Sequence, residues 1–230
     1  MIRCEDIKVT FNAGLATEKR ALRGVDLEIP QAEFVTVIGS NGAGKSTLLN
    51  TIAGDIRVSS GGLFFDETNV TAVSAAGRTR DVARVFQDPL AGTCGNMTVE
   101  ENMALAYGRG KRGGLAPALN DDLRDLFREQ LKRLNLGLEN RLGAEMGLLS
   151  GGQRQSVSLL MSALQPSKIL LLDEHTAALD PKTAALVMDI TDQIVEEKKL
   201  TVMMVTHSMR QALDHGTRTI MMHEGKVMFD

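Results

Sequence analysis

The spacing of apolar and polar residues predicts two kinds of strand in this chain. Residues Ile2 to Phe11 and Ala21 to Ile29 alternate apolar with polar side chains, which is typical of antiparallel strands covered on one face. Phe34 to Ile38, Ile169 to Leu172 and Thr201 to Val205 are nearly continuous apolar runs, which are typical of strands buried on both faces. We therefore expect a parallel sheet with a smaller antiparallel sheet in the amino-terminal part.

Helical patterns fill the segments between these strands. Ser46 to Ala53 predicts a short helix, and Pro181 to Lys198 predicts the helix that connects two of the buried strands. Between about 98 and 142 apolar residues recur at helical spacing, and this stretch opens with the capping-box sequence TVEE. The basic segment Arg109 to Pro117 within it is interpreted as a solvated loop between helices.

The order strand, helix, strand predicts an α/β fold in which the buried strands run parallel. We expect strand 169–172 to lie directly beside strand 34–38 in one sheet, and residues 219–229 to form an edge hairpin. One domain of residues 1–230, with a helical insert at about 90–165, accounts for the whole pattern.

The sequence GSNGAGKST lies between a predicted buried strand and a predicted helix. It fits the pattern G-x-x-x-x-G-K-[ST], in which backbone N–H groups and the amino end of the helix surround phosphate groups. Lys45 would reach the outer phosphates, and the Ser46 hydroxyl would bind Mg²⁺. A glycine-rich turn that binds nothing is the alternative, but the flanking strand and helix are the context that the motif requires. The predicted nucleotide-binding residues are Gly39, Ser40, Asn41, Gly42, Ala43, Gly44, Lys45, Ser46 and Thr47.

Two adjacent carboxylates, Asp173 and Glu174, end the buried strand at 169–172. Adjacent side chains on a strand point in different directions, so we expect Asp173 to hold Mg²⁺ and Glu174 to act as the base that orients the attacking water. Taken alone, the pair could be an exposed acidic strand end. Together with the lysine loop, the two carboxylates predict hydrolysis of a bound nucleotide. His207 follows the next buried strand and could contact the γ-phosphate, although a histidine at a strand end is often structural.

Composition argues against several other classes of protein. The formal charge is −3, with Lys and Arg spread along the chain, so there is no basic footprint for nucleic acid. Cys4 and Cys94 lie far apart, which predicts neither a disulfide nor a zinc site and fits a reduced cytosolic protein. No apolar run approaches the roughly 20 residues that span a bilayer. If the protein acts at a membrane, another subunit must hold it there.

The motif LSGGQ, Leu149 to Gln153, is not needed for the phosphate site that residues 39–47 already provide. It precedes an apolar helical pattern, so Ser150, Gly151 and Gly152 would form a second anion-binding turn with hydroxyl and N–H donors but no lysine. The sequence therefore predicts two phosphate-type sites in one chain.

Together these motifs resemble those of the ATP-binding cassette (ABC) ATPases, the motor subunits of ABC transporters, over nearly the whole chain. GSNGAGKST resembles the Walker A loop, LSGGQ the family signature and ILLLDE the Walker B strand. The resemblance assigns Gln87 in VFQDP to the Q-loop, Ala178 to Asp180 to the D-loop and His207 to the switch histidine. It implies a P-loop NTPase core with a parallel sheet, an N-terminal antiparallel β-subdomain and an inserted α-helical subdomain.

The resemblance also implies a reason for two phosphate-type sites. In this family two cassettes pair head to tail, and the LSGGQ turn of one closes over ATP held by the lysine loop of the other. The implied nucleotide contacts from that second site are Ser150, Gly151, Gly152, Gln153 and Asp180. The implied catalytic residues are Glu174, His207 and Gln87, and the implied Mg²⁺ ligands are Ser46, Gln87 and Asp173.

Three positions carry more than one interpretation. Phe11 stands where the family places an aromatic ring against adenine, but a phenylalanine in an edge strand is equally a packing residue. Asp180 before Pro181 fits a helix N-cap as well as the D-loop acid. His175 replaces the proline that usually follows the catalytic acid, and it is either a turn residue or a group that biases the ionisation of Glu174.

The implied function is that of the ATPase subunit of an ABC transporter, with ATP and Mg²⁺, which powers separate integral membrane permease subunits. We expect a homodimer that is cytoplasmic and peripheral on the inner face of the cell membrane through the permease. A single short cassette without a fused membrane segment is typical of prokaryotic systems with separate subunits, and an importer is favoured over an exporter, with a solute-binding protein as a further partner. The segments TCGNMTVEEN and DEHTAALDPKTA resemble cassettes paired with permeases akin to those for branched-chain amino acids, which favours an amino-acid-like solute. The alternative is a soluble ABC ATPase such as an iron–sulfur assembly ATPase.

Overall fold

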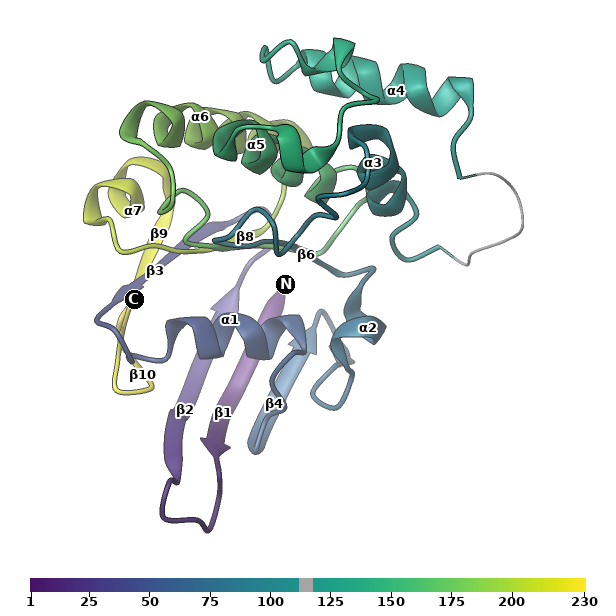
Figure 1. Cartoon of the computed structure of the whole chain (residues 1–230). Coiled ribbons are helices and arrows are strands. Elements are labelled where there is room, and N and C mark those ends of the chain that lie inside the picture. The colour runs from purple at the N-terminus through teal and green to yellow at the C-terminus, as the bar shows by residue number, and fades with distance from the viewer. Residues whose placement is uncertain (112–117) are drawn as a thin grey trace. The chain divides into compact units, whose positions relative to one another are not determined.

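The chain divides into two units in the computed structural model, which describes residues 1–111 and 118–230 (Figure 1). The first unit comprises residues 1–83, 168–174 and 199–230, and the second comprises residues 84–167 and 175–198. Most of the loop predicted at Arg109 to Pro117 lies outside the described residues.

An antiparallel sheet forms part of the first unit. Its strands are β1 (Ile2–Phe11), β2 (Lys19–Ile29), β4 (Ser60–Phe65) and β5 (Thr68–Asn69), in the order β2-β1-β4-β5. The alternation predicted for the first two strands is confirmed, because every second side chain in much of β1 and β2 is buried. The expectation that Phe11 lies in an edge strand is wrong: β1 pairs with β2 on one side and β4 on the other.

The second sheet is mainly parallel and contains the predicted buried strands. The strands of this sheet are β3 (Phe34–Gly39), β6 (Val82–Val85), β7 (Ile169–Asp173), β8 (Val202–Val205), β9 (Arg218–His223) and β10 (Lys226–Phe229), in the order β10-β9-β3-β8-β7-β6; the predicted buried strands are β3, β7 and β8. The hairpin of β9 and β10 is antiparallel and ends the sheet, as predicted.

The expectation that strand 169–172 lies directly beside strand 34–38 is wrong. β8 pairs in parallel with β3 and with β7, and therefore separates them. All four residues of β8 are buried, as is typical of a central strand in a sheet that is covered on both faces. This order matters for the site, because the segment that follows β8 carries His207.

Helix α1 (Lys45–Ala53) lies between the two sheets of the first unit. It contacts β2 of the antiparallel sheet and β3, β7 and β8 of the parallel sheet. Leu48, Leu49 and Ile52 are fully buried, and Gly54 ends the helix in the left-handed conformation with a φ of 90°. The short helices α2 (Ala75–Arg78) and α7 (Met209–His215) complete the unit, and α7 packs on β3.

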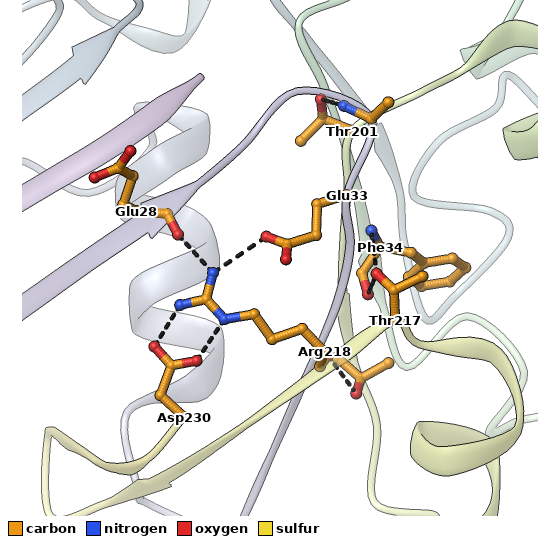
Figure 2. Close-up of polar contacts among 9 residues, drawn as sticks. Glu28, Glu33, Phe34, Thr201, Thr217, Arg218 and Asp230 are labelled. Carbon is orange, nitrogen blue, oxygen red and sulfur yellow. Dashed lines mark hydrogen bonds and ion pairs between the residues drawn. The ribbon is translucent and has the colours of Figure 1, made fainter.

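Polar contacts fix the amino end of β3 (Figure 2). Arg218 on β9 donates hydrogen bonds to the carbonyl of Glu28 at 2.8 Å and to the Glu33 carboxylate at 3.1 Å, and it forms a two-pronged ion pair with Asp230. Phe34 donates its N–H to the Thr217 hydroxyl at 3.1 Å. The strand that leads into the glycine-rich turn therefore has a rigid starting point.

The second unit is helical. Its elements are α3 (Val99–Tyr107), α4 (Asp121–Lys132), two 3₁₀ turns (Leu138–Asn140 and Met146–Leu148), α5 (Gly151–Ser162) and α6 (Pro181–Lys198). The capping box predicted at Thr98 and Glu101 is confirmed. Helix α5 contacts α3, α4 and α6, and its apolar residues Val157 and Leu160 are buried. Within the described part of the chain, no helix combines the length and apolar character that crossing a membrane requires.

Candidate active site

The glycine-rich turn connects β3 to α1 at the carboxyl end of the parallel strand. Gly39 has a φ of 150°, and a Cβ there would lie 2.3 Å from the main-chain oxygen of Met222. Gly44 has a φ of 105°, and a Cβ there would lie 2.9 Å from the main-chain oxygen of Ala21. Neither position has space for a side chain, so this backbone path requires glycine at both. The path is the one by which the motif exposes N–H groups to phosphates.

Lys45 opens α1 and is only 5% exposed. Its Nζ donates hydrogen bonds to the carbonyl oxygens of Gly39 at 2.8 Å and Ser40 at 3.1 Å. Burial lowers the pKa of Lys45, while the carboxylates of Glu174 and Asp173 act in the opposite direction. An ammonium group has three donors, so two can hold the loop while the third addresses a phosphate oxygen.

A pocket of about 180 Å³ adjoins this loop within the first unit. It brings residues 41–47 together with Phe11, Glu174 and His207, as the predicted nucleotide site requires. Phe11 is 38% exposed at the end of β1, so its ring is not a core packing residue. The stacking of this ring on adenine stays a prediction.

Two residues of β2, Lys19 and Ala21, also line the pocket, and the sequence analysis did not identify them. Lys19 pairs with Phe11 in the antiparallel ladder. Matching the two alternating strands across their connecting loop would have placed Lys19 beside the ring. A second cation, besides Lys45, is thus available to an anionic ligand.

Glu174 and His207 meet at the side of the pocket where β7 and β8 end. Oε1 of Glu174 lies 2.7 Å from Nε2 of His207. The backbone of Glu174 has a φ of 47°, and its N–H donates to the Val205 carbonyl at 3.0 Å. Such a left-handed conformation costs a non-glycine residue on the order of 1 kcal/mol, so the surrounding strands must hold it in place. A carboxylate fixed in this way and paired with an imidazole is suited to orienting a water molecule.

Oxygen donors suited to Mg²⁺ belong to the same unit. Ser46 lies in the first turn of α1 and lines the pocket, and Asp173 is the last residue of β7. Hydroxyl and carboxylate oxygens, completed by phosphate oxygens and water, are the ligands that Mg²⁺ prefers. These donors fit Mg²⁺. Among residues 1–111 and 118–230, no group of three or more His, Cys, Asp or Glu side chains gathers as a metal site.

In the second unit, LSGGQ forms the amino end of α5. Ser150 is the N-cap: its Oγ accepts a hydrogen bond from the Gln153 N–H at 3.2 Å, and Gln153 Oε1 accepts one from the Ser150 N–H at 3.2 Å. This reciprocal pair is a capping box, which the spacing S-x-x-Q could have revealed in the sequence. Ser150 and Gly151 are exposed, so the turn presents a polarised helix end to solvent.

Gly152 is buried where α5 meets α6. A Cβ on Gly152 would lie 2.0 Å from Cγ2 of Thr183. Thr183 donates its N–H to Oδ1 of Asp180 at 3.1 Å, so the N-cap interpretation of Asp180 is confirmed. Hydrogen bonds from Thr183, first from its hydroxyl and then from its N–H, lower the pKa of Asp180. The D-loop role of Asp180 stays a prediction.

Gln87 and His175 also belong to the second unit. Gln87 is exposed two residues after β6, and the preceding residue, Phe86, accepts a hydrogen bond from Nε2 of Gln155 on α5 at 3.1 Å. His175 is 2% exposed, and its Nε2 lies 3.2 Å from the Thr191 hydroxyl on α6. This burial against α6 favours the interpretation of His175 as a turn residue with a structural role.

Comparison with known sequences places this chain among transporter subunits. The family model described as ABC transporter matches residues 22–177. The chain is 46% identical over 230 residues to the tyrosine transport ATP-binding protein of Clostridioides difficile (strain R20291), covering 100% of this chain and 91% of that protein. It is 34% identical over 240 residues to the phosphonates import ATP-binding protein PhnC 2 of Haloarcula marismortui, covering 100% of this chain and 84% of that protein.

Solved structures agree with this similarity. The dimeric structure of MJ0796, a bacterial ABC transporter cassette, matches with a TM-score of 0.84 and 29% identity over 100% of this chain and 97% of that one. A dimeric post-hydrolysis state of the same cassette, bound to ADP and Pi, matches equally well. The nucleotide pocket, the LSGGQ helix and these similarities lead to one conclusion: the chain belongs to the ABC transporter family and is one of its ATP-hydrolysing cassettes.

Proposed function

We propose that the chain is the ATPase subunit of an importer, and that two copies pair head to tail around ATP. One observation carries this proposal: the chain has a complete lysine cradle in one unit and a lysine-free, capped helix end in the other. Each copy would lend the second feature to a nucleotide in the cradle of its neighbour. The dimeric cassettes among the similar structures support this arrangement.

The residues around the pocket would divide the work of hydrolysis. Ser46 and Asp173, with Gln87 as a further ligand, would hold Mg²⁺. The ion would supply positive charge that offsets the negative charge of the phosphates. Lys45 would bind the same phosphates, and Glu174 would take the proton of the attacking water. His207, now 2.7 Å from Glu174, would orient that carboxylate and contact the γ-phosphate.

The LSGGQ turn would bind the γ-phosphate of the neighbour's nucleotide without a lysine. A helix end on an exposed surface contributes only about 0.3–1 kcal/mol to anion binding, and more where water is excluded. Closure would therefore depend on the γ-phosphate and reverse after hydrolysis. The capping box keeps Ser150 and Gly151 in position for this contact.

The second unit would provide the contact with the permease. Leu90, Leu105 and Leu148 are 50%, 58% and 72% exposed there. Gly95 accepts a hydrogen bond from Gly147 at 2.8 Å, which brings the segments of Leu90 and Leu148 close together. Exposed leucines on a soluble chain indicate a surface that is covered in the working complex.

The solute would be amino-acid-like, because the relative at 46% identity is a tyrosine transport ATP-binding protein. Other relatives are named for phosphonates and thiamine import, which supports the importer direction. The chain would lie on the inner face of the membrane through its permease, and a solute-binding protein would deliver the solute from outside.

Replacing Glu174 with Gln tests the proposal. The amide cannot accept the proton of the attacking water, so ATP turnover should fall by about 10²–10⁴-fold while ATP binding persists. ATP should then accumulate between two copies, and light scattering should detect an ATP-dependent dimer.

Glu196→Gln is the matched control, because Glu196 is an exposed residue of α6 and the substitution makes the same chemical change. Its turnover should equal that of the unmodified protein. If Glu174→Gln kept normal turnover, Glu174 would not be the base. If it bound ATP and stayed monomeric at all concentrations, the head-to-tail pair would be wrong.

A further inference from the structure

Arg78, the last residue of α2, is only 2% exposed, which is unusual for an arginine. Its guanidinium donates through Nη1 to the carbonyl oxygens of Thr51 and Ile52, both at 2.7 Å. Through Nη2 it donates to the carbonyl of Val70 at 2.5 Å. All of these groups belong to the first unit. A buried guanidinium that bonds to backbone carbonyls does not have the environment of a surface charge.

Two of the three acceptors are in the last turn of α1. The final carbonyls of a helix lack partners within the helix and carry its negative dipole end. Gly54 donates its N–H to two of them, Asn50 and Thr51, and Arg78 supplies the donors for Thr51 and Ile52. The carboxyl end of α1 is thus closed by a cap and by a buried positive charge.

The other end of α1 is the phosphate cradle, which begins with Lys45. The helix has only nine residues, so about 14 Å separates its two ends. Burial lowers the pKa of Arg78, but a guanidinium keeps its proton in proteins, so its charge persists. The Asp55 carboxylate, two residues after the helix, acts on the same guanidinium and reduces its field at that distance, so the effect of Arg78 on phosphates comes from holding the helix in place.

We propose that Arg78 is a positioning residue for the phosphate site: it fixes the carboxyl end of α1 so that the amino end of the helix and Lys45 present a rigid, positively polarised cradle. A loosely held helix would have to be ordered when ATP binds, which would reduce affinity. The proposal rests on the proposed function in one respect only, namely that phosphates bind at the amino end of α1.

A purely structural role for Arg78 is the competing explanation. The bond to Val70 and the position of the guanidinium 5.9 Å from the Phe65 ring also tie α2 to the antiparallel sheet. If Arg78 had only a structural role, its replacement would lower the fraction of folded protein. It would not change how the affinity for a nucleotide depends on the number of phosphates. The two explanations therefore differ in a measurable quantity.

The experiment measures the affinity of the folded protein for AMP, MgADP and a non-hydrolysable MgATP analogue. Arg78→Met should weaken binding of the ATP analogue by about 5- to 25-fold, that of MgADP less and that of AMP least. Arg78→Lys, which keeps the charge but loses the planar fork, should show the same order with smaller losses. If Arg78→Met fails to fold, the Arg78→Lys variant alone distinguishes the positioning role from the purely structural one.

Arg109→Met is the matched control. Arg109 is a partly buried arginine of the second unit that donates to the carbonyl of Gln165 at 2.9 Å. Its replacement should leave all three affinities unchanged. Equal losses for the three ligands in the Arg78 variants, or no loss, would overturn the proposal. Lys45→Ala, measured alongside, should weaken binding of the ATP analogue. Normal binding in that variant would overturn the phosphate site itself. This result distinguishes a failure of the proposed function from a failure of the Arg78 proposal.

Discussion

At the scale of single residues, the proposed nucleotide pocket would separate recognition of the phosphates from recognition of the base. Lys45 and residues 41–47 line the phosphate end, while Phe11 comes from the antiparallel sheet. Phe11 lies at the last position of β1 and is 38% exposed. An exposed ring next to a nucleotide pocket is available for stacking on a flat base.

Phe11→Ala should therefore weaken MgATP binding but leave tripolyphosphate binding unchanged. Aromatic stacking contributes about 0.5–1.5 kcal/mol, which corresponds to about a 2- to 12-fold change in Kd. Phe11→Tyr keeps the ring and serves as the control, with an affinity close to that of the unmodified protein. Isothermal titration calorimetry with the two ligands makes the comparison. A similar loss for both ligands would assign Phe11 to the structure of the cradle rather than to the base.

The contrast between predicted and missed residues has a physical cause. Residues 41–47 are contiguous in one motif, and Glu174 and His207 each follow an apolar strand, so the sequence identified them without knowledge of contacts. Lys19 reaches the pocket only through its pairing with Phe11. Arg78 is buried only because α1 and the chain at Val70 surround it. The surroundings of these two residues depend on segments distant in the sequence, so the local pattern of apolar and polar residues does not reveal them.

At the scale of elements, helices α5 and α6 are joined at their amino ends. Gly152 of the LSGGQ turn packs against Thr183, and the N–H of Thr183 is held by Asp180. The LSGGQ turn and the Asp180 N-cap therefore meet where Gly152 faces the methyl group of Thr183. The sequence predicts only an N–H donor role for Gly152, because the distance between two helices depends on both of them and not on the sequence of either one alone.

Gly152→Ala should destabilise the fold, because its new methyl group would overlap Cγ2 of Thr183 at 2.0 Å. Overpacking of this kind costs about 1–3 kcal/mol, which in a chain of this size lowers Tm by roughly 2–4 °C per kcal/mol. Thr183→Ser removes only the clashing methyl group and keeps the hydroxyl. In the double variant, thermal unfolding should return towards the Tm of Thr183→Ser alone.

Gly151→Ala is the control for this experiment, since a Cβ at Gly151 would only touch Leu179 at an ordinary 3.5 Å. Its Tm should change little. Strictly additive Tm losses in the double variant of Gly152 and Thr183 would show that the two residues do not act on each other.

The order of the strands in the parallel sheet could not be predicted from the sequence either. Three apolar runs were identified as parallel strands, but their composition does not say which run lies in the middle. β8 takes the place between β3 and β7, and this places the segment of His207 next to Glu174. The contact between the two catalytic candidates is thus a consequence of topology.

At the scale of the whole molecule, each chain would carry one half of two different sites in the proposed head-to-tail pair. The lysine cradle belongs to the first unit and the LSGGQ turn to the second. In a two-fold pair the same two surfaces meet twice, so a head-to-tail dimer contains two composite sites. A chain that lacks a working cradle still offers an intact turn, and a chain with a defective turn still offers an intact cradle.

Mixing two inactive variants tests this arrangement directly. Lys45→Ala removes the cradle cation, whereas Gly151→Asp places a carboxylate at the first position of α5, where it suits the helix end but repels phosphate. Neither variant alone should hydrolyse ATP. In an equal mixture, half of the dimers combine both variants and one of their two sites is intact, so activity should reach about a quarter of the unmodified level. A site built within one chain gives no such recovery at any ratio, because every cradle would then face the turn of its own defective chain.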